Sequence, residues 1–404
     1  PVDLTKHILI IDIVTARNIN KPQHKPTYVH LYVANRSTTM NNATTASNIY
    51  ALGINQVANL INTLGAAITV VVQGSMGTGK SSILNIIALM NPTHKPVYLD
   101  CTTLVDGADM FMVKYSDDGK TFKTVPLEDL GLHLPDQPVI LMLDEIGKCN
   151  RSVILACNRI MLERKHSGYE LHPDSIVFAT TNLGAEGLGD LLPAHTRNRI
   201  TVVTMRNPDN MEYIEWGIDN DIDPIILGFC KEHPELFHSF EQYENPDENP
   251  YIFHPRSARA AFWTPRSGEK SSDILKLRHL LDDTQLTAAL IGTIGDRTAL
   301  DLAAFISLAD KLPTRDQIET DPMNAPVPDS PAAVCMVVYR ALATIERTWV
   351  DPWLTYMNRL SKEAQGLFVN GVRAPKYSRR DYVVQNKKFQ DWCMANNYMF
   401  SADK

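Results

Sequence analysis

A glycine-rich segment that begins at Gly74 constrains this 404-residue chain more than any other feature. Residues 74–81 have the sequence Gly-Ser-Met-Gly-Thr-Gly-Lys-Ser and match the pattern G-x-x-x-x-G-K-[ST] at every fixed position. An apolar, β-branched run precedes the segment at 68–73, and a helical pattern follows it at 81–90. Glycines let successive backbone N–H groups face one phosphate group, and the start of a helix adds a positive dipole. The segment therefore predicts a phosphate-binding loop between a strand and a helix.

This loop supplies the first set of candidate nucleotide-binding residues. Lys80 is expected to reach the β- and γ-phosphates, and the Ser81 hydroxyl is expected to hold Mg²⁺. The alternative is a glycine-rich turn without a ligand, which the strand before it and the helix after it disfavour. The candidates are Gly74, Ser75, Met76, Gly77, Thr78, Gly79, Lys80, Ser81 and Ser82.

The acidic pair Asp144-Glu145 is a second signal, because it ends the apolar run 139–143. Burying both charges would be costly, whereas the carboxyl end of a parallel strand faces the crevice in which ligands bind. We expect Asp144 to hold Mg²⁺ through water and Glu145 to polarise the attacking water as general base. A strand that simply ends in a solvated acidic turn is the alternative, which the phosphate loop upstream disfavours.

Two further signals are weaker. Asn182 follows the apolar run 176–179, and its amide is a candidate for orienting water or contacting a γ-phosphate, although Thr-Asn after a strand is also ordinary turn chemistry. Arg197 and Arg199 precede the run 200–205. An arginine supplied by a neighbouring subunit stabilises charge in phosphoryl transfer. A surface pair that bonds to acids or helix ends explains this spacing equally well.

The order of apolar runs predicts the fold class. Runs at 68–73, 97–101, 139–144, 175–180 and 200–205 alternate with helical patterns, which is typical of strands buried on both faces of a parallel sheet. After 206 helical patterns dominate, with a Pro-rich loop at 312–331. We therefore expect a small β-containing extension at 1–47, with strands at 7–14 and 28–34. An α/β nucleotide-binding domain at 48–206, a helical lid at 207–312 and a C-terminal helical extension at 313–404 would follow.

In this order the signals resemble the AAA+ superfamily of P-loop NTPases, and most closely its MoxR-like ATPases. Three stretches carry the likeness. Residues 150–182 resemble the family's helix, hairpin and sensor-one strand, and 192–200 resemble its arginine-finger segment. Residues 253–259 resemble its Ser-Pro-Arg sensor-two segment. The resemblance covers about 48–312, and it departs from the family pattern at Asn198, Ile200 and His254.

The resemblance implies a fold, a set of roles and a mode of action. It implies a five-stranded parallel sheet with a C-terminal helical lid, with Asn182 as sensor one. Arg199 would be the finger that acts on the neighbouring subunit, with Arg197 as the alternative, and Arg256 would be sensor two. It further implies Mg²⁺-dependent ATP hydrolysis by a hexameric ring that remodels a partner protein, often a von Willebrand factor A-type partner. A hairpin expected at 110–125, around an Asp-Gly turn, is either the family's pore insert or a surface hairpin without a role.

Charge and composition leave two other classes of function open. The net charge of −7 does not favour a general nucleic-acid binder, but a local basic groove would still allow a nucleic-acid-dependent motor or loader. A non-hydrolysing nucleotide-binding scaffold is the third reading, which the intact acidic pair disfavours. No apolar run reaches the roughly 18 residues of a membrane span, and the first residues lack the features of a signal peptide. Six cysteines without a Cys-x-x-Cys pair favour a reducing, cytoplasmic compartment.

Overall fold

The computed structural model describes residues 50–183, 194–374 and 377–396. The strands expected at 7–14 and 28–34, and with them the N-terminal extension, lie outside the described residues. So do residues 192 and 193 of the arginine-finger segment. Within the described residues, no helix combines the length and the apolar character that crossing a membrane requires.

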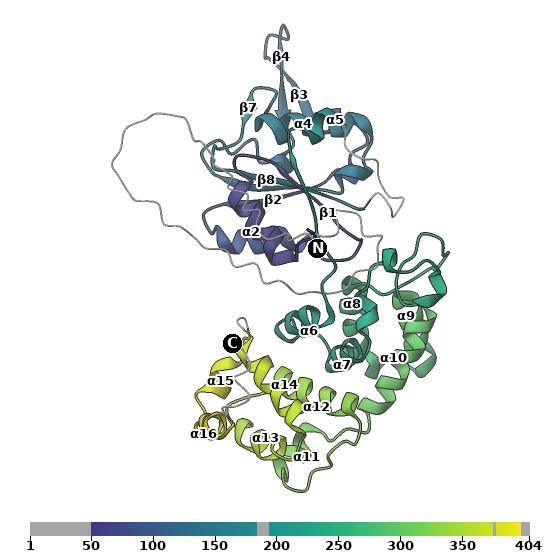
Figure 1. Cartoon of the computed structure of the whole chain (residues 1–404). Coiled ribbons are helices and arrows are strands. Elements are labelled where there is room, and N and C mark those ends of the chain that lie inside the picture. The colour runs from purple at the N-terminus through teal and green to yellow at the C-terminus, as the bar shows by residue number, and fades with distance from the viewer. Residues whose placement is uncertain (1–49, 184–193, 375–376, 397–404) are drawn as a thin grey trace, which may run out of the picture. The chain divides into compact units, whose positions relative to one another are not determined.

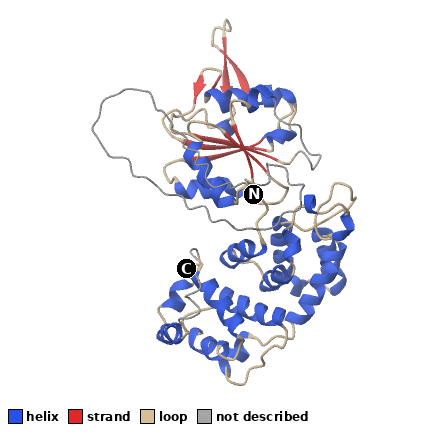
Figure 2. Ribbon diagram, in the orientation of Figure 1, coloured by secondary structure: helices blue, strands red, loops and turns tan. Residues whose placement is uncertain are grey.

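A five-stranded parallel sheet forms the centre of the α/β part, as the sequence predicted (Figure 2). Its strand order is β2-β5-β8-β1-β9, so β1, the first strand of this sheet along the chain, lies between the last two, β8 and β9. Because the strands are parallel, the carboxyl ends of β5, β8 and β1 lie next to one another at one edge of the sheet. The strands are β1 (Val70–Gln73), β2 (Lys95–Asp100), β5 (Val139–Asp144), β8 (Ile176–Thr181) and β9 (Thr201–Thr204).

Helices cover both faces of the centre of this sheet, which explains why β1, β5 and β8 are buried apolar runs, while the edge strands β2 and β9 are partly exposed. On β1, Val70 and Val72 pack on one side with residues of α2 (Ile54–Leu64) and α3 (Ser82–Met90). Val71 points to the opposite side and packs with residues of α4 (Arg151–Glu163). Figure 1 shows α2 and α4 on opposite sides of the sheet.

Two hairpins leave this α/β part of the chain. The first pairs β3 (Phe111–Tyr115) with β4 (Phe122–Pro126), and its turn contains Gly119 at a φ of 66°. The hairpin predicted from the Asp-Gly turn is thereby confirmed. The second pairs β6 (Lys165–His166) with β7 (Tyr169–Glu170), directly after α4.

The remainder of the described chain is helical. Its helices are α5 (Ala194–Arg197), α6 (Asn210–Asp219), α7 (Pro224–Glu232), α8 (Pro265–Lys276), α9 (Asp283–Ile294), α10 (Asp296–Ala309), α11 (Arg315–Thr320), α12 (Pro331–Thr344), α13 (Val350–Met357), α14 (Lys362–Arg373), α15 (Arg380–Val384) and α16 (Lys387–Ala395). The loop expected at 312–331 thus contains a short helix, α11. Thr314 caps that helix by accepting a hydrogen bond from the Gln317 N–H, a signal that lies within the Pro-rich stretch.

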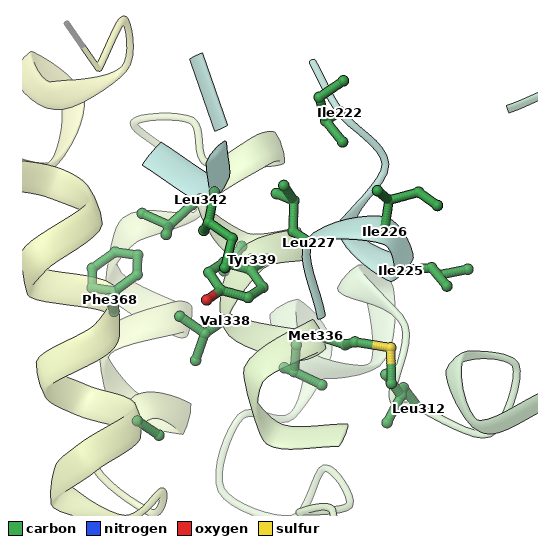
Figure 3. Packing of buried hydrophobic residues seen from close by; sticks show 14 of the residues in the cluster. Ile222, Ile225, Ile226, Leu227, Leu312, Met336, Val338, Tyr339, Leu342 and Phe368 are labelled. Atoms are coloured by element: carbon green, nitrogen blue, oxygen red, sulfur yellow. The ribbon is translucent and has the colours of Figure 1, made fainter. Parts of the chain in front are cut away.

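One hydrophobic core runs through the helical part from Tyr213 to Trp392. Figure 3 shows its centre, where Leu227 of α7 lies among residues of α12 such as Tyr339 and Leu342. The two helices approach closely, since a Cβ atom on Gly228 would lie 2.5 Å from Met336 Cγ. The division between lid and C-terminal extension at 312 stays a prediction, but the core continues across it.

Candidate nucleotide-binding site

The predicted phosphate loop leaves the carboxyl end of β1 and enters α3. Gly77 and Gly79 adopt positive φ angles of 72° and 89°, which side-chain-bearing residues rarely adopt. The Thr78 hydroxyl donates to the Ser75 carbonyl at 2.8 Å and closes the turn between them. Ser81 stands at the N-cap position of α3, and its side chain makes no capping hydrogen bond there. This geometry, a curled backbone in front of a helix start, is that of a loop whose N–H groups receive a phosphate.

The structure brings Lys80 and Asn182 together, although they are 102 positions apart in the chain. Lys80 is 6% exposed, and its Nζ donates to the Gly74 carbonyl, the Ser75 carbonyl and Asn182 Oδ1 at 2.8, 2.9 and 2.8 Å. Asn182 Nδ2 is buried and has no hydrogen-bond partner among the described residues. A buried amide donor beside the lysine fits a phosphate oxygen or an attacking water as its acceptor.

The Asp144 carboxylate is buried, with 8% exposure, and is held by neutral donors. The Tyr98 hydroxyl donates to Oδ2 at 3.0 Å. The Thr180 hydroxyl and the Glu145 N–H donate to Oδ1. Within the described residues no cationic side chain pairs with this carboxylate. A buried anion without an ion pair is costly, so the arrangement fits a site that receives a cation.

Glu145 follows Asp144 in a left-handed conformation, with a φ of 54°. Non-glycine residues in this conformation are uncommon, and they occur preferentially at functional sites. The Glu145 N–H also donates to the Thr180 hydroxyl at 3.2 Å, which fixes the turn. Its carboxylate lies with Oε2 3.1 Å from Lys148 Nζ, and the side chain is 25% exposed. The carboxylate is therefore oriented by Lys148 at the carboxyl edge of the sheet.

The donor set fits magnesium bound together with a nucleotide. Among the described residues, no group of three His, Cys, Asp or Glu side chains could hold a metal by itself. Magnesium differs from zinc or calcium in this respect, since one or two protein oxygens, several waters and substrate phosphates usually complete its shell. Ser81 follows β1 and Asp144 ends β5, and only β8 lies between these two strands in the sheet.

The start of α8 contacts the phosphate loop, a contact that the sequence did not predict. Thr264 caps this helix by accepting from the Ser267 N–H at 3.1 Å, and Pro265 is its first residue. The Arg266 N–H donates to the Gly77 carbonyl at 3.3 Å. A Cβ atom on Gly77 would lie 2.7 Å from Thr264 Cβ, so this approach requires glycine. Arg266 is exposed, and its backbone lies next to the loop.

Arg256, the sensor-two candidate, lies elsewhere. It belongs to a loop before α8, where its Nη1 donates to the Glu244 carbonyl at 3.4 Å. Its N–H donates to His254 Nδ1 at 3.1 Å. No described contact joins Arg256 to the phosphate loop, whereas the backbone of Arg266 bonds to it. The structure thus places Arg266, and not Arg256, beside Gly77.

Arg197 and Arg199 are exposed. They precede β9 and so lie at the amino ends of the strands, whereas the phosphate loop lies at the carboxyl ends. β9 pairs in parallel with β1, with Thr201 opposite Val70 and Thr204 opposite Gln73. Arg199 precedes Thr201, while the loop follows Gln73, so at about 3.3 Å per residue the two are separated by the length of the strand. An arginine in this place cannot reach the loop of its own subunit.

Comparisons with known proteins give no family name. No model of a protein family and no curated protein matches this sequence. Among solved structures, the RuvB Holliday junction branch migration motor of Thermotoga maritima is similar at 16% identity and a TM-score of 0.33, over 74% of this chain and 85% of that one. A protein of Cytophaga hutchinsonii presumed to be an ATPase is similar at 13% identity and a TM-score of 0.31, over 65% and 91%.

The fold is nevertheless that of AAA+ P-loop NTPases, as the sequence predicted. This assignment rests on the parallel sheet with β1 between β8 and β9, on the phosphate loop between β1 and α3, and on the helical part that follows.

Two residues near the site, Arg266 and Tyr98, were not predicted from the sequence. Arg266 had a signal, because Thr264-Pro265 is typical of a helix start. Tyr98 had none, since nothing in its strand distinguishes it from a packing residue.

Proposed function

We propose that this chain is an ATP-hydrolysing, MoxR-like AAA+ ATPase that acts as a homo-oligomeric ring, most simply a hexamer. The observation that carries the proposal is the convergence of Lys80, Asn182, Asp144 and Glu145 at one edge of the sheet. A glycine-rich turn without a ligand would not require a buried lysine, a buried amide donor without a partner and a buried carboxylate without an ion pair. Phosphoryl transfer needs a phosphate-binding backbone, a lysine, a magnesium ligand and a residue that positions water. The phosphate loop with its helix start and the acidic pair supply residues of these kinds.

Each residue has a defined task in this proposal. The loop N–H groups and Lys80 bind the phosphates, and Asn182 Nδ2 donates to a phosphate oxygen or to the attacking water. Ser81 and Asp144 would hold magnesium, which when bound neutralises charge on the phosphate oxygens. Glu145 accepts a proton from the attacking water. The exposed side chain of Arg266, whose backbone lies beside the loop, donates to the terminal phosphate.

A pocket between the loop and the helical part supports a nucleotide ligand. Ser75, Met76 and Thr78 form its loop side, while aromatic side chains that include Phe240 and Trp263 form the other. Aromatic walls next to a phosphate-binding loop suit a flat ring system such as a nucleobase. ATP, rather than GTP, follows from the MoxR-like resemblance.

The simplest test is phosphate release by the purified chain. We expect steady release from ATP with magnesium and loss of at least about 90% of it in EDTA, since the donor set is incomplete without the metal. Lys80→Ala is the inactive reference. Equal release by wild type and Lys80→Ala would mean that this loop does not carry the activity.

Substitution of the two lid arginines separates the sensor-two candidates. Arg266→Ala is expected to lower the rate of phosphate release on the order of 10²-fold, because it removes a charged donor from the reacting phosphate. Arg256→Ala is the matched control and is expected to keep the wild-type rate, because its guanidinium bonds to the Glu244 carbonyl. The opposite ranking of the two variants would return the role to Arg256.

The motion of the helical part over the loop would remodel a protein partner, and a von Willebrand factor A-type protein is the candidate that the resemblance implies. A nucleic-acid motor is the second candidate, and one observation favours it. On the β3–β4 hairpin Lys114 lies directly opposite Lys123, a like-charge pair that is unfavourable without an anion, and the exposed Tyr115 and Phe122 lie beside it. Stimulation of ATP hydrolysis by single-stranded DNA, lost on Lys114→Glu, would select this candidate.

A further inference from the structure

Tyr98 reaches the acidic pair from the edge strand of the sheet. It lies on β2, in register with Met142, two positions before the end of β5. Side chains lean along the strand, so a tyrosine at this position can span the distance to the strand end. Its hydroxyl donates to Asp144 Oδ2 at 3.0 Å. Tyr98 is 44% exposed, so its ring is only partly packed against the sheet.

The contacts of Asp144 leave little freedom to its carboxylate. An ionised carboxylate has about four acceptor directions. Tyr98 occupies one on Oδ2, while the Thr180 hydroxyl and the Glu145 N–H occupy two on Oδ1. These donors come from β2, from β8 and from the turn after β5, so they fix both the position and the rotation of the carboxylate. One direction, on Oδ2, is left.

The hydrogen bond between Tyr98 and Asp144 has a fixed direction. An ionised carboxylate can only accept, so the Tyr98 hydroxyl is the donor. Tyr98 is the one described donor to Oδ2, so removing its hydroxyl would leave that oxygen unrestrained.

We propose that Tyr98 is a positioning residue of the magnesium site, whose hydroxyl orients Asp144 so that the remaining acceptor direction meets a magnesium-bound water. This inference rests on the proposed function, because Asp144 concerns magnesium only if the chain binds a magnesium–nucleotide complex. Tyr98 acts through Asp144 and touches neither the phosphate loop nor the reacting atoms. Partners that orient a ligand carboxylate in this way influence metal affinity strongly.

The test measures how strongly magnesium and nucleotide support each other's binding. The affinity for a fluorescent ATP analogue is determined with saturating magnesium and again in EDTA, and the ratio of the two values reports their coupling. Tyr98→Phe is expected to reduce this ratio roughly tenfold. The affinity in EDTA is expected to stay at the wild-type value. Tyr382→Phe is the matched control, since Tyr382 of α15 is 39% exposed and its hydroxyl has no described hydrogen bond.

Asp144→Asn makes the possible failures distinguishable. It is expected to abolish the coupling. If it does so while Tyr98→Phe keeps the wild-type ratio, the positioning role is refuted and the magnesium site stands. If Asp144→Asn also keeps that ratio, the proposed magnesium site itself is refuted. A Tyr98→Phe protein that loses affinity equally with and without magnesium, and melts earlier without ligand, would show that the hydroxyl only supports the fold.

Discussion

Replacing Glu145 by glutamine is expected to stop turnover of ATP while nucleotide binding persists. The rate of phosphate release should fall by roughly 10²–10⁴-fold, because glutamine keeps the shape of the side chain but cannot accept the proton of the attacking water. Binding should persist, since the described contacts of the Glu145 side chain involve Lys148 and no residue of the phosphate loop. The substitution also removes an ion pair that is 25–32% exposed, which costs the fold less than about 1 kcal/mol.

The measurements are steady-state phosphate release and equilibrium binding of a fluorescent ATP analogue. Glu163→Gln is the matched control, because Glu163 ends α4, is exposed and has no described partner. It should behave as wild type in both assays. Unchanged turnover in Glu145→Gln would contradict the general-base assignment and favour a different base or a non-hydrolysing scaffold.

The same variant is the tool for finding the partner. Because Glu145→Gln is expected to bind ATP without hydrolysing it, the variant should stay in the ATP-bound state and retain the partner molecule that this state binds. Recovery of one protein in ATP, and its absence in ADP or from Lys80→Ala, would support remodelling of a protein. Recovery of DNA without protein would favour the motor, with the β3–β4 hairpin as its contact.

The α/β part could be predicted closely from the sequence, for a physical reason. A strand buried on both faces must be apolar throughout, so β1, β5 and β8 were visible as runs, whereas the partly exposed edge strands β2 and β9 showed shorter apolar runs. The phosphate loop and the Asp-Gly hairpin depend on glycine at positions of positive φ, which a sequence records directly. Together these local rules were sufficient for the sheet, its helices and the edge at which the acidic pair lies.

Local sequence rules did not identify which arginine of the helical part lies beside the phosphate loop. Two Pro-Arg steps, at 255–256 and 265–266, are similar in sequence, and the earlier one fitted the family pattern. Only the second begins a helix, because Thr264 caps it. Whether that helix start reaches Gly77 depends on packing between distant segments, as does the bond from Tyr98 to Asp144. Long-range contacts of this kind carry no local signal.

Replacing Arg199 by alanine is expected to have the largest effect of all, a loss of about 10³–10⁵-fold in phosphate release if it is the arginine that completes a neighbour's site. The position of Arg199 in the sheet explains why it would act on a neighbouring subunit and not on its own. Arg199 precedes β9 and the phosphate loop follows β1, and these strands are parallel neighbours, so the two lie at opposite ends of the sheet. Arg197→Ala is the matched control and should retain most of the activity, whereas the reverse result would make Arg197 the finger.

Mixed assemblies test whether the arginine acts on the neighbouring subunit. Glu145→Gln and Arg199→Ala subunits are each expected to be inactive alone. In a random equal mixture, about a quarter of the head-to-tail interfaces would join an intact Glu145 to an intact Arg199 of the neighbour, so turnover should reappear. Mixing with Lys80→Ala in place of Arg199→Ala provides the control, because the subunits with an intact Glu145 then lack the lysine, and no site is complete. If no activity returns from assemblies of normal size, Arg199 does not act between subunits. The strand geometry that separates it from its own loop then leaves it no part in the reaction.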